Sequence, residues 1–308
     1  MNSVQIKQKA KEIGFTHVGI VKAEAGIEAE RLENWLKLGY QADMAWMANP
    51  KRQDISLVMP GVKSLICLGL NYYSPDQRSE NPNHGKISRY GWGRDYHRVL
   101  TKKLKQLDTW LHSQLAEIHT RYYVDTGPIS EKAWAERAGI GWIGKHSNLI
   151  TRDYGSWLFL AEILIDVELE SDRPHPEHCG TCTRCIDACP TDAITEPFVV
   201  NANLCIAYHT IENRDPELPE VIATNLNNWV AGCDICQDVC PWNQRFAQAT
   251  SESDFSPYPE NINPSLNELA EISEEEYLKR FTGSALRRIK IERLRRNARA
   301  AIQSSRKS

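Results

Sequence analysis

Hydrophobic positions in the first 170 residues follow helical spacing in some segments and form strand-like runs in others. Apolar residues three and four apart predict amphipathic helices over residues 4–13, 28–38, 98–118 and 130–138, with a helical turn at 44–48. Short apolar runs predict strands over residues 17–21, 64–73, 121–124 and 156–167. Helices that alternate with strands predict an α/β or α+β body.

Segments rich in proline, glycine and asparagine divide the chain. Residues 75–85 are predicted to form a loop, and residues 139–148 form a glycine-rich loop before the last strand. We place a joint at Pro174–Pro176 and a linker at 250–263. The predicted parts are a body (1–170), a cysteine-rich part (171–250) and a short helical C-terminal segment (251–308).

The cysteine-rich part carries the most specific pattern in the chain. From Cys179 to Pro190 the spacing is C-x2-C-x2-C-x3-C-P, the run found in bacterial two-cluster ferredoxins. From Cys233 to Pro241 the same run recurs without its first cysteine, and Cys205 lies between the two runs as the substitute. The fourth cysteine of each such run ligates the other cluster.

Eight cysteines therefore fit two [4Fe-4S] clusters. We assign to the first cluster Cys179, Cys182, Cys185 and Cys240, and to the second cluster Cys189, Cys205, Cys233 and Cys236. Two zinc sites are the alternative, but zinc sites use paired C-x2-C elements and give no reason for the proline after the fourth cysteine. Disulfides are disfavoured because the N-terminus has no secretory signal.

Composition limits the class of protein. The chain has 308 residues, of which 41% are apolar and 25% charged, as is usual for a globular protein. No run of eighteen apolar residues is present, so we expect no membrane span. Nine cysteines without a signal peptide predict a reducing cytoplasm. The ninth, Cys67, lies in an apolar run and is expected to be a small buried side chain.

Charge is distributed unevenly along the chain. From Lys279 to Ser308 there are eleven Lys or Arg residues and one acid, Glu292, so this segment is +10 and the preceding 278 residues are −13. An apolar stripe in the same segment consists of Ile291, Leu294, Ala298 and Ile302, with arginines on the other side. A basic tail on an acidic body indicates a polyanionic partner, while a solubilising helix face is the alternative.

Candidate chemistry gathers in the loops that follow strands. Asp125 ends a strand before a predicted helix with Ser130 as its N-cap, and a carboxyl in apolar surroundings has a raised pKa and can act as an acid. The alternative is that Asp125 organises the turn before Pro128. The segment 141–145 lacks the spacing of a phosphate loop. His97, His146 and His209 are candidate hydrogen-bond donors or structural histidines.

Four motifs together resemble the epoxyqueuosine reductase family, the cobalamin-dependent iron–sulfur enzymes of tRNA queuosine synthesis. They are the segments Ser88–His97, Val124–Glu131 and Gly139–Asn148, and the cysteine pattern with its displaced Cys205. The resemblance covers nearly the whole chain. It implies a nitroreductase-like α/β cobalamin-binding domain within an α+β chain, a ferredoxin-like domain with two [4Fe-4S] clusters and a C-terminal helical piece that helps to hold tRNA. Only about one helix pair is expected after residue 263.

The same resemblance implies roles for particular residues. Asp125 takes the position of the family's proton donor. For cob(II)alamin it implies contacts from Arg52, Asp125, His146, Ser147, Asn148, Ile150, Ala207 and Asp234. For tRNA phosphates we name Arg214, Arg287, Arg288, Lys290, Arg293, Arg295 and Arg296.

The implied reaction converts epoxyqueuosine to queuosine at the wobble position of tRNA, with two electrons, two protons and loss of water. The implied partners are tRNAs with GUN anticodons (Asp, Asn, His and Tyr) and an unidentified electron donor, and the protein is expected to be a cytoplasmic monomer. Two alternatives belong to other classes. One is a corrinoid reductive dehalogenase, which the basic tail disfavours. The other is a non-catalytic electron-transfer module, which would bind no corrinoid.

Overall fold

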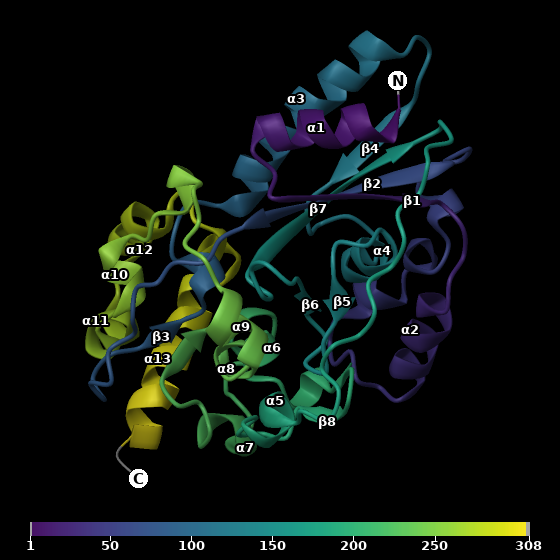
Figure 1. Cartoon of the computed structure of the whole chain (residues 1–308). Helices are drawn as coiled ribbons and strands as arrows, with labels where there is room; N and C mark the ends of the chain where they lie inside the picture. The colour runs from purple at the N-terminus through teal and green to yellow at the C-terminus, as the bar shows by residue number, and fades with distance from the viewer. Residues whose placement is uncertain (1, 306–308) are drawn as a thin grey trace.

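The computed structural model describes residues 2–305, and a four-stranded sheet is its central feature (Figure 1). The strands lie in the order β1 (His17–Lys22), β2 (Ser64–Asn71), β7 (Leu158–Ile165) and β4 (Thr120–Tyr123). Every neighbouring pair is antiparallel. The four predicted strands are confirmed, although β2 and β7 are shorter at their ends than the apolar runs that predicted them.

Helices cover both faces of this sheet, as Figure 1 shows. α1 (Ser3–Ile13) and α3 (Tyr96–Gln114) pack on one face, and α4 (Glu131–Arg137) packs on the other. α3 begins at Tyr96 because the Asp95 side chain accepts from the His97 backbone N–H, and it ends before Leu115, which is extended. The predicted helix 98–118 was therefore too long at its C-terminal end.

The segment that begins α4 departs from the predicted cap. Ser130 occupies the N-cap position, but its hydroxyl donates to the Arg52 carbonyl and makes no cap hydrogen bond. The glycine-rich loop that follows α4 contains a short antiparallel hairpin of β5 (Trp142–Ile143) and β6 (Leu149–Ile150). α2 (Glu28–Lys37) and a 3-10 turn at Ala45–Ala48 complete the body.

The cysteine-rich part is built from short elements. They are α5 (Arg184–Asp187), β8 (Ile194–Glu196), β9 (Val199–Val200), α6 (Ile206–Ile211), α7 (Glu220–Ala223), β10 (Trp229–Ala231), α8 (Ile235–Asp238) and α9 (Pro241–Phe246). α5 and α8, which lie within the two cysteine runs, pack against each other. β10 pairs in parallel with β3 (Lys86–Ile87), so this part is tied to a loop of the body.

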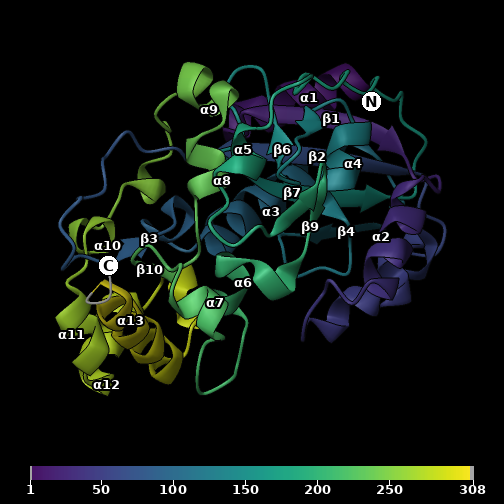
Figure 2. The same ribbon diagram turned by 90° about the horizontal axis from the view of Figure 1, so that it is seen from below.

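The C-terminal helices share a hydrophobic core with the cysteine-rich part. They are α10 (Pro259–Ile262), α11 (Leu266–Glu271), α12 (Glu274–Phe281) and α13 (Ile291–Ser305), and Figure 2 shows α11–α13 grouped beside β3 and β10. Leu294 and Ala298 of α13 pack with Val230 of β10. Between residue 263 and residue 305, where the described part ends, the chain forms three α-helices, so the expectation of about one helix pair was wrong.

The predicted linker at 250–263 is also corrected. It contains a 3-10 turn at Ser253–Phe255 and α10, and Phe255 is 4% exposed and packs in the core beneath the sheet helices. An aromatic side chain fixed in a core holds the segment in place, so it is a packed connection. The three-part division of the chain stays a prediction.

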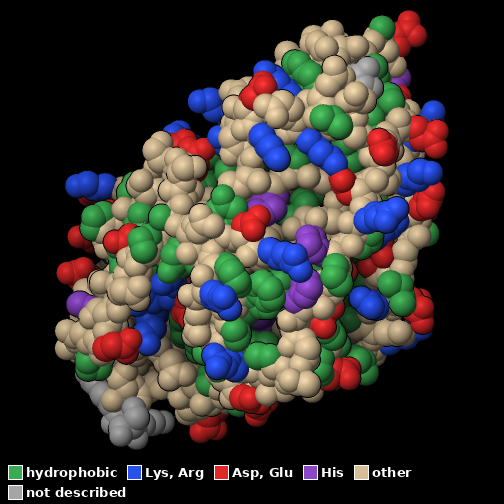
Figure 3. Space-filling view, viewed as in Figure 1, with side chains coloured by type: hydrophobic (Ala, Val, Ile, Leu, Met, Phe, Trp, Pro, Cys, Tyr) green, Lys and Arg blue, Asp and Glu red, His purple; other side chains and the backbone are tan. Residues whose placement is uncertain are grey.

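Two features of the surface bear on possible partners. No helix within residues 2–305 has the length and apolar character needed to cross a membrane. Acidic and basic side chains are interspersed on the face seen in Figure 3, with histidines beside a group of apolar side chains near its centre. Arg306 and Lys307 of the basic tail lie outside the described residues.

Candidate active site and cluster sites

A large cavity lies where the body, the cysteine-rich part and the C-terminal segment meet. Its volume is about 1620 Å³, above the range of about 300–1,000 Å³ typical of small-molecule sites. Its wall includes Trp46, Asp125, Lys132, Glu212 and Arg288, so each of the three parts contributes side chains. The cavity is therefore large enough for a ligand bigger than a typical small molecule.

Asp125 extends into this cavity from the end of β4. Its φ is +57°, a left-handed conformation that costs a non-glycine residue energy, and its side chain is half exposed. The carboxylate lies 3.3 Å from His97 Nε2, and the other ring nitrogen of His97 lies 2.8 Å from Asp95. The imidazole is thus held between two carboxylates.

The pKa of the Asp125 carboxyl differs from the sequence prediction. Burial acts to raise the pKa of Asp125, but the hydrogen bonds from His97 and Tyr96 and the charge of His97 outweigh it and lower that pKa. Burial opposes the charge on His97, but its bonds to Asp125 and Asp95 raise its pKa to about 9. The expected raised pKa of Asp125 was therefore wrong. At neutral pH the ionised Asp125 lies beside protonated His97.

Arg52 is the second predicted cofactor residue on the cavity wall. Its guanidinium donates to the carbonyl of Ile129 at 2.9 Å and to that of Gly127 at 3.3 Å. These bonds tie the loop after Asp125 to the 3-10 turn at Pro50–Arg52.

The other predicted cobalamin contacts are not among the residues that line the cavity: His146, Ser147, Asn148, Ile150, Ala207 and Asp234. His146 is buried, and burial lowers its pKa to about 4, so the ring is neutral. Its Nδ1 accepts from Asn148 N, while Nε2 is buried without a partner in the described chain. An unpaired buried nitrogen is available to a ligand, so this loop stays a candidate for cofactor contact.

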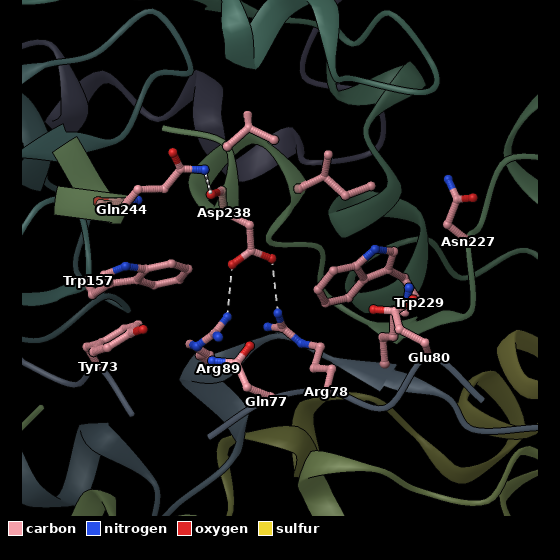
Figure 4. Close-up of a pocket in the computed structure, with 14 residues that line it drawn as sticks. Tyr73, Gln77, Arg78, Glu80, Arg89, Trp157, Asn227, Trp229, Asp238 and Gln244 are labelled. Carbon is pink, nitrogen blue, oxygen red and sulfur yellow. Dashed lines mark hydrogen bonds and ion pairs between the residues drawn. The ribbon is translucent and has the colours of Figure 1, made fainter. Parts of the chain in front are cut away.

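The Asp234 carboxylate is held by three hydrogen-bond donors of the protein. Its carboxylate is fully buried and accepts from Ser88 and from the Arg78 guanidinium, and also from the backbone N–H of Arg89 at 2.8 Å. Figure 4 shows the neighbouring Asp238 between Arg78 and Arg89. Its carboxylate oxygens lie 3.0 Å from Nη1 of Arg78 and 2.9 Å from Nη1 of Arg89. These pairs line a smaller pocket of about 520 Å³ and join the 74–89 loop to α8.

The assignment of the eight cysteines to two clusters stays a prediction, and the charges that act on several of the thiols bear on it. Burial raises the pKa of Cys233, and the neighbouring thiols of Cys205 and Cys189 raise it further. Burial likewise raises the pKa of Cys185, with contributions from Cys240 and Cys182. Cys185 and Cys240 come from different runs and act on each other, as the predicted first cluster requires, but Cys185 also raises the pKa of Cys236 of the predicted second set. Among residues 2–305, no group of three His, Cys, Asp or Glu side chains is arranged to hold a single metal ion.

Cys205, a predicted ligand of the second cluster, lies near the large cavity. Lys132 extends from α4 into the cavity, and its charge lowers the pKa of Cys205, which burial raises. Ile211, at the end of the helix that follows Cys205, also lines the cavity. Electrons held on the second cluster would therefore be close to a cofactor in the cavity.

The basic residues of the C-terminal segment fall into two groups. Arg293, Arg295 and Arg296 donate to main-chain carbonyls, among them those of Ile211, Ile272 and His209. Arg214, Arg287, Arg288 and Lys290 are exposed, and Arg287 and Arg288 line the cavity. Arg288 is paired with Glu212 at the cavity wall.

Sequence reasoning did not select Glu131 or Lys132, although both lie on the cavity wall. Glu131 ends one of the motifs that carried the family resemblance, which was the available signal. Tyr96 was likewise quoted only within a motif, and it lines the cavity beside His97.

Comparison with known proteins agrees with this geometry. A family model described as "Epoxyqueuosine reductase QueG, DUF1730" matches residues 52–126, and one described as "4Fe-4S double cluster binding domain" matches residues 178–243. The epoxyqueuosine reductase of Synechocystis sp. is 67% identical over 275 residues, which are 89% of this chain and 95% of that protein. That of Gloeobacter violaceus is 51% identical over 308 residues, 98% and 96% of the two chains.

Solved structures are also similar. An epoxyqueuosine reductase with an epoxyqueuosine-modified tRNA-Tyr stem loop has a TM-score of 0.91 and 33% identity, over 98% of this chain and 81% of that one. The Bacillus subtilis enzyme, with its aspartate-bearing catalytic loop swung out of the active site, has a TM-score of 0.91 and 32% identity, over 99% and 82%. A double-cluster domain beside a large cavity defines an iron–sulfur oxidoreductase. The chain belongs to the epoxyqueuosine reductase family.

Proposed function

We propose that this chain reduces epoxyqueuosine to queuosine in tRNA, using cobalamin supplied with electrons by two [4Fe-4S] clusters. The observation that supports the proposal is the cavity, because it is lined both by Asp125 and by Lys132, whose charge acts on Cys205. The reaction takes up two electrons and two protons, forms the alkene and releases one water. When bound, cobalamin supplies the reducing metal centre and the clusters supply single electrons.

The protein supplies protons at the reacting oxygen. Asp125 and His97 together hold one proton at neutral pH, at a site half open to the cavity. We propose that Asp125 passes this proton to the epoxide oxygen as the ring opens, which avoids an alkoxide in a site with little water. Asp95 keeps the imidazole oriented for the transfer.

The substrate nucleoside must leave the anticodon loop to enter the cavity. We propose that the exposed cations Arg214, Arg287, Arg288 and Lys290 contact backbone phosphates around the entrance. The guanidinium groups of Arg293, Arg295 and Arg296 are held by main-chain carbonyls, so we propose a supporting role for these three.

Several finer statements belong to the same proposal. We propose that the substrates are the tRNAs with GUN anticodons, and that the protein is a monomer in the cytoplasm with a separate one-electron donor. The relative from Bacillus subtilis has an aspartate loop swung out of its active site. We propose that the loop carrying Asp125 can also move.

The test is turnover by the anaerobically purified protein with cobalamin, reductant and modified tRNA, followed by mass spectrometry of the nucleosides. We expect queuosine to form, and Asp125→Ala to lower turnover by about 10²-fold or more while iron, sulfide and cobalamin contents stay unchanged. Unchanged turnover in that variant would remove Asp125 from the mechanism. Zinc in place of iron would overturn the proposal as a whole.

A further inference from the structure

The loop that carries Asp125 is closed by a contact from the start of α4. The backbone N–H of Asp125 donates to Oε1 of Glu131, six residues further along the chain. This bond satisfies a backbone group at a residue whose φ is +57°. An unfavourable backbone conformation persists only where its surroundings hold it, so the Glu131 carboxyl fixes Asp125 in place.

A second carboxyl lies behind Glu131, away from the cavity. Glu162 is on β7, where its register neighbours are Cys67 on β2 and Tyr123 on β4. It is fully buried in the apolar layer between the sheet and α4. Neither of its oxygens has a hydrogen-bond partner in the described chain, and the carboxyls that act on it are those of Glu131 and Asp125.

The two carboxyls cannot both be ionised at low cost. Burial raises the pKa of Glu162 far above its ordinary value, and the Glu131 charge raises it further. Burial and the Asp125 charge raise the pKa of Glu131 to about 8. The pair therefore keeps a proton at neutral pH. The other titratable or charged groups that act on the pair are Arg52, Cys67, Tyr96, Asp125 and Lys132.

We propose that Glu131 is a positioning residue that holds the Asp125 loop over the cavity, and that the buried Glu162 carboxyl, whose oxygens have no other partner, orients Glu131 by donating to it. This assignment rests on the proposed role of Asp125 in proton donation. Glu162 gives its hydrogen to one Glu131 oxygen, and the other oxygen remains free to accept the Asp125 N–H. Loss of the Glu131 acceptor leaves the strained turn unsupported, and the loop moves out of the cavity.

The competing role for the Glu131–Glu162 pair is to store protons for the reaction. Substitution by glutamine separates the two roles, because the side-chain amide keeps an acceptor oxygen but carries no transferable proton. Glu131→Gln therefore retains the positioning contact, whereas Glu131→Ala removes it. Glu162→Gln keeps a donor to Glu131, whereas Glu162→Leu removes the donor at similar size.

The experiment measures hydrogen–deuterium exchange of the segment 124–131 in the cluster-loaded, cobalamin-loaded full chain. We expect Glu131→Ala to speed exchange of the Asp125 amide by about 2- to 10-fold, the effect of losing one hydrogen bond. kcat should fall by about tenfold or more, with KM for a modified stem loop within about twofold. Glu131→Gln should stay close to the wild type in both measurements, and Glu162→Leu should resemble Glu131→Ala.

Glu136→Ala is the matched control. Glu136 is on the same helix, also lines the cavity and accepts the Ile143 N–H at 2.7 Å, but makes no bond to Asp125 among the described contacts. Its loss should leave Asp125 amide exchange unchanged. The positioning role is wrong if Glu131→Ala exchanges like the wild type, or if Glu131→Gln loses as much turnover as Glu131→Ala.

The readouts also separate this proposal from the proposed function. Should Asp125→Ala retain full turnover, Asp125 would not be the donor, yet the exchange of the loop would still report whether Glu131 holds it. If Glu131→Ala does not fold, as judged by iron content, Glu162→Leu and Glu131→Gln still give opposite expected results.

Discussion

At the scale of single residues, Asp125 is defined by its neighbours more than by burial. Its side chain is half exposed and lies 3.3 Å from His97, so charge pairing outweighs desolvation. The result is a shared proton: the pKa of Asp125 is lowered while that of His97 is raised to about 9. If Asp125 is the proton donor, as proposed, it draws on a proton shared with His97, and the pKa of His97 sets the highest pH at which it can donate.

The pH dependence of turnover follows from this pair. The proton on His97 is fully held below the ordinary His pKa of about 6.5 and is lost as the pH passes about 9. We therefore expect kcat/KM to fall above pH 9. His97→Gln removes the group that titrates there, so the alkaline limb should move to lower pH and turnover at pH 7 should fall by about tenfold or more. Nucleoside mass spectrometry between pH 6 and 10 measures both. A wild-type limb unchanged in the variant would contradict this assignment.

At the scale of elements, the register of β7 decides what Glu162 can do. The strand places it opposite Cys67 and Tyr123, in a layer that otherwise consists mainly of apolar side chains. A buried carboxyl without a cation in contact is neutral in the folded chain. This strand position therefore makes the folding of the sheet dependent on pH.

The sign of that dependence can be worked out. The folded chain binds a proton on Glu162 more tightly than the unfolded chain, whose Glu pKa is about 4.5. The contribution of Glu162 to the free energy of unfolding is therefore complete below pH 4.5. It is lost as the pH rises from 4.5 toward the raised pKa of Glu162 in the folded chain. Glu162→Gln cannot titrate, so its Tm should exceed that of the wild type by about 2–4 °C at pH 8 and by less at pH 5. Thermal melts at a fixed scan rate measure this, and an equal difference at both pH values would contradict it.

The sequence predicted those features that depend on local spacing. The cysteine runs, the strand before Asp125 and the amphipathic α1 and α3 all follow from residues close together in the chain. The sheet order β1-β2-β7-β4 could not be derived, because it joins strands that are far apart in the chain. The same holds for Glu162 behind Glu131, and for Arg78, which reaches Asp234 across 156 positions. His97 lowers the pKa of Asp125 across 28 positions, which explains why the local prediction of its direction failed.

At the scale of the whole molecule, the basic side chains of the C-terminal segment fall into a packed group and an exposed group. α13 packs its apolar side on β10 and α11, and three of its arginines bond to carbonyls of neighbouring segments. Other cations remain exposed, and Arg287 is on the wall of the cavity. A net charge of +10 in this segment therefore overstates the number of charges free to meet phosphate.

The salt dependence of tRNA binding should separate these two groups. Each exposed cation that neutralises a phosphate contributes about 0.7–0.9 to the slope of log K against log salt, because it releases bound counterions. Arg287→Ala combined with Lys290→Ala should therefore reduce the slope by about 1.4–1.8 for a modified anticodon stem loop. Arg295→Ala is the matched comparison, since its guanidinium donates to the Ile272 carbonyl at 3.0 Å, and it should lower Tm while leaving the slope unchanged. Fluorescence-anisotropy titrations between 50 and 300 mM salt measure the slope for each variant. Equal slopes for all variants would mean that Arg287 and Lys290 do not contact the tRNA backbone.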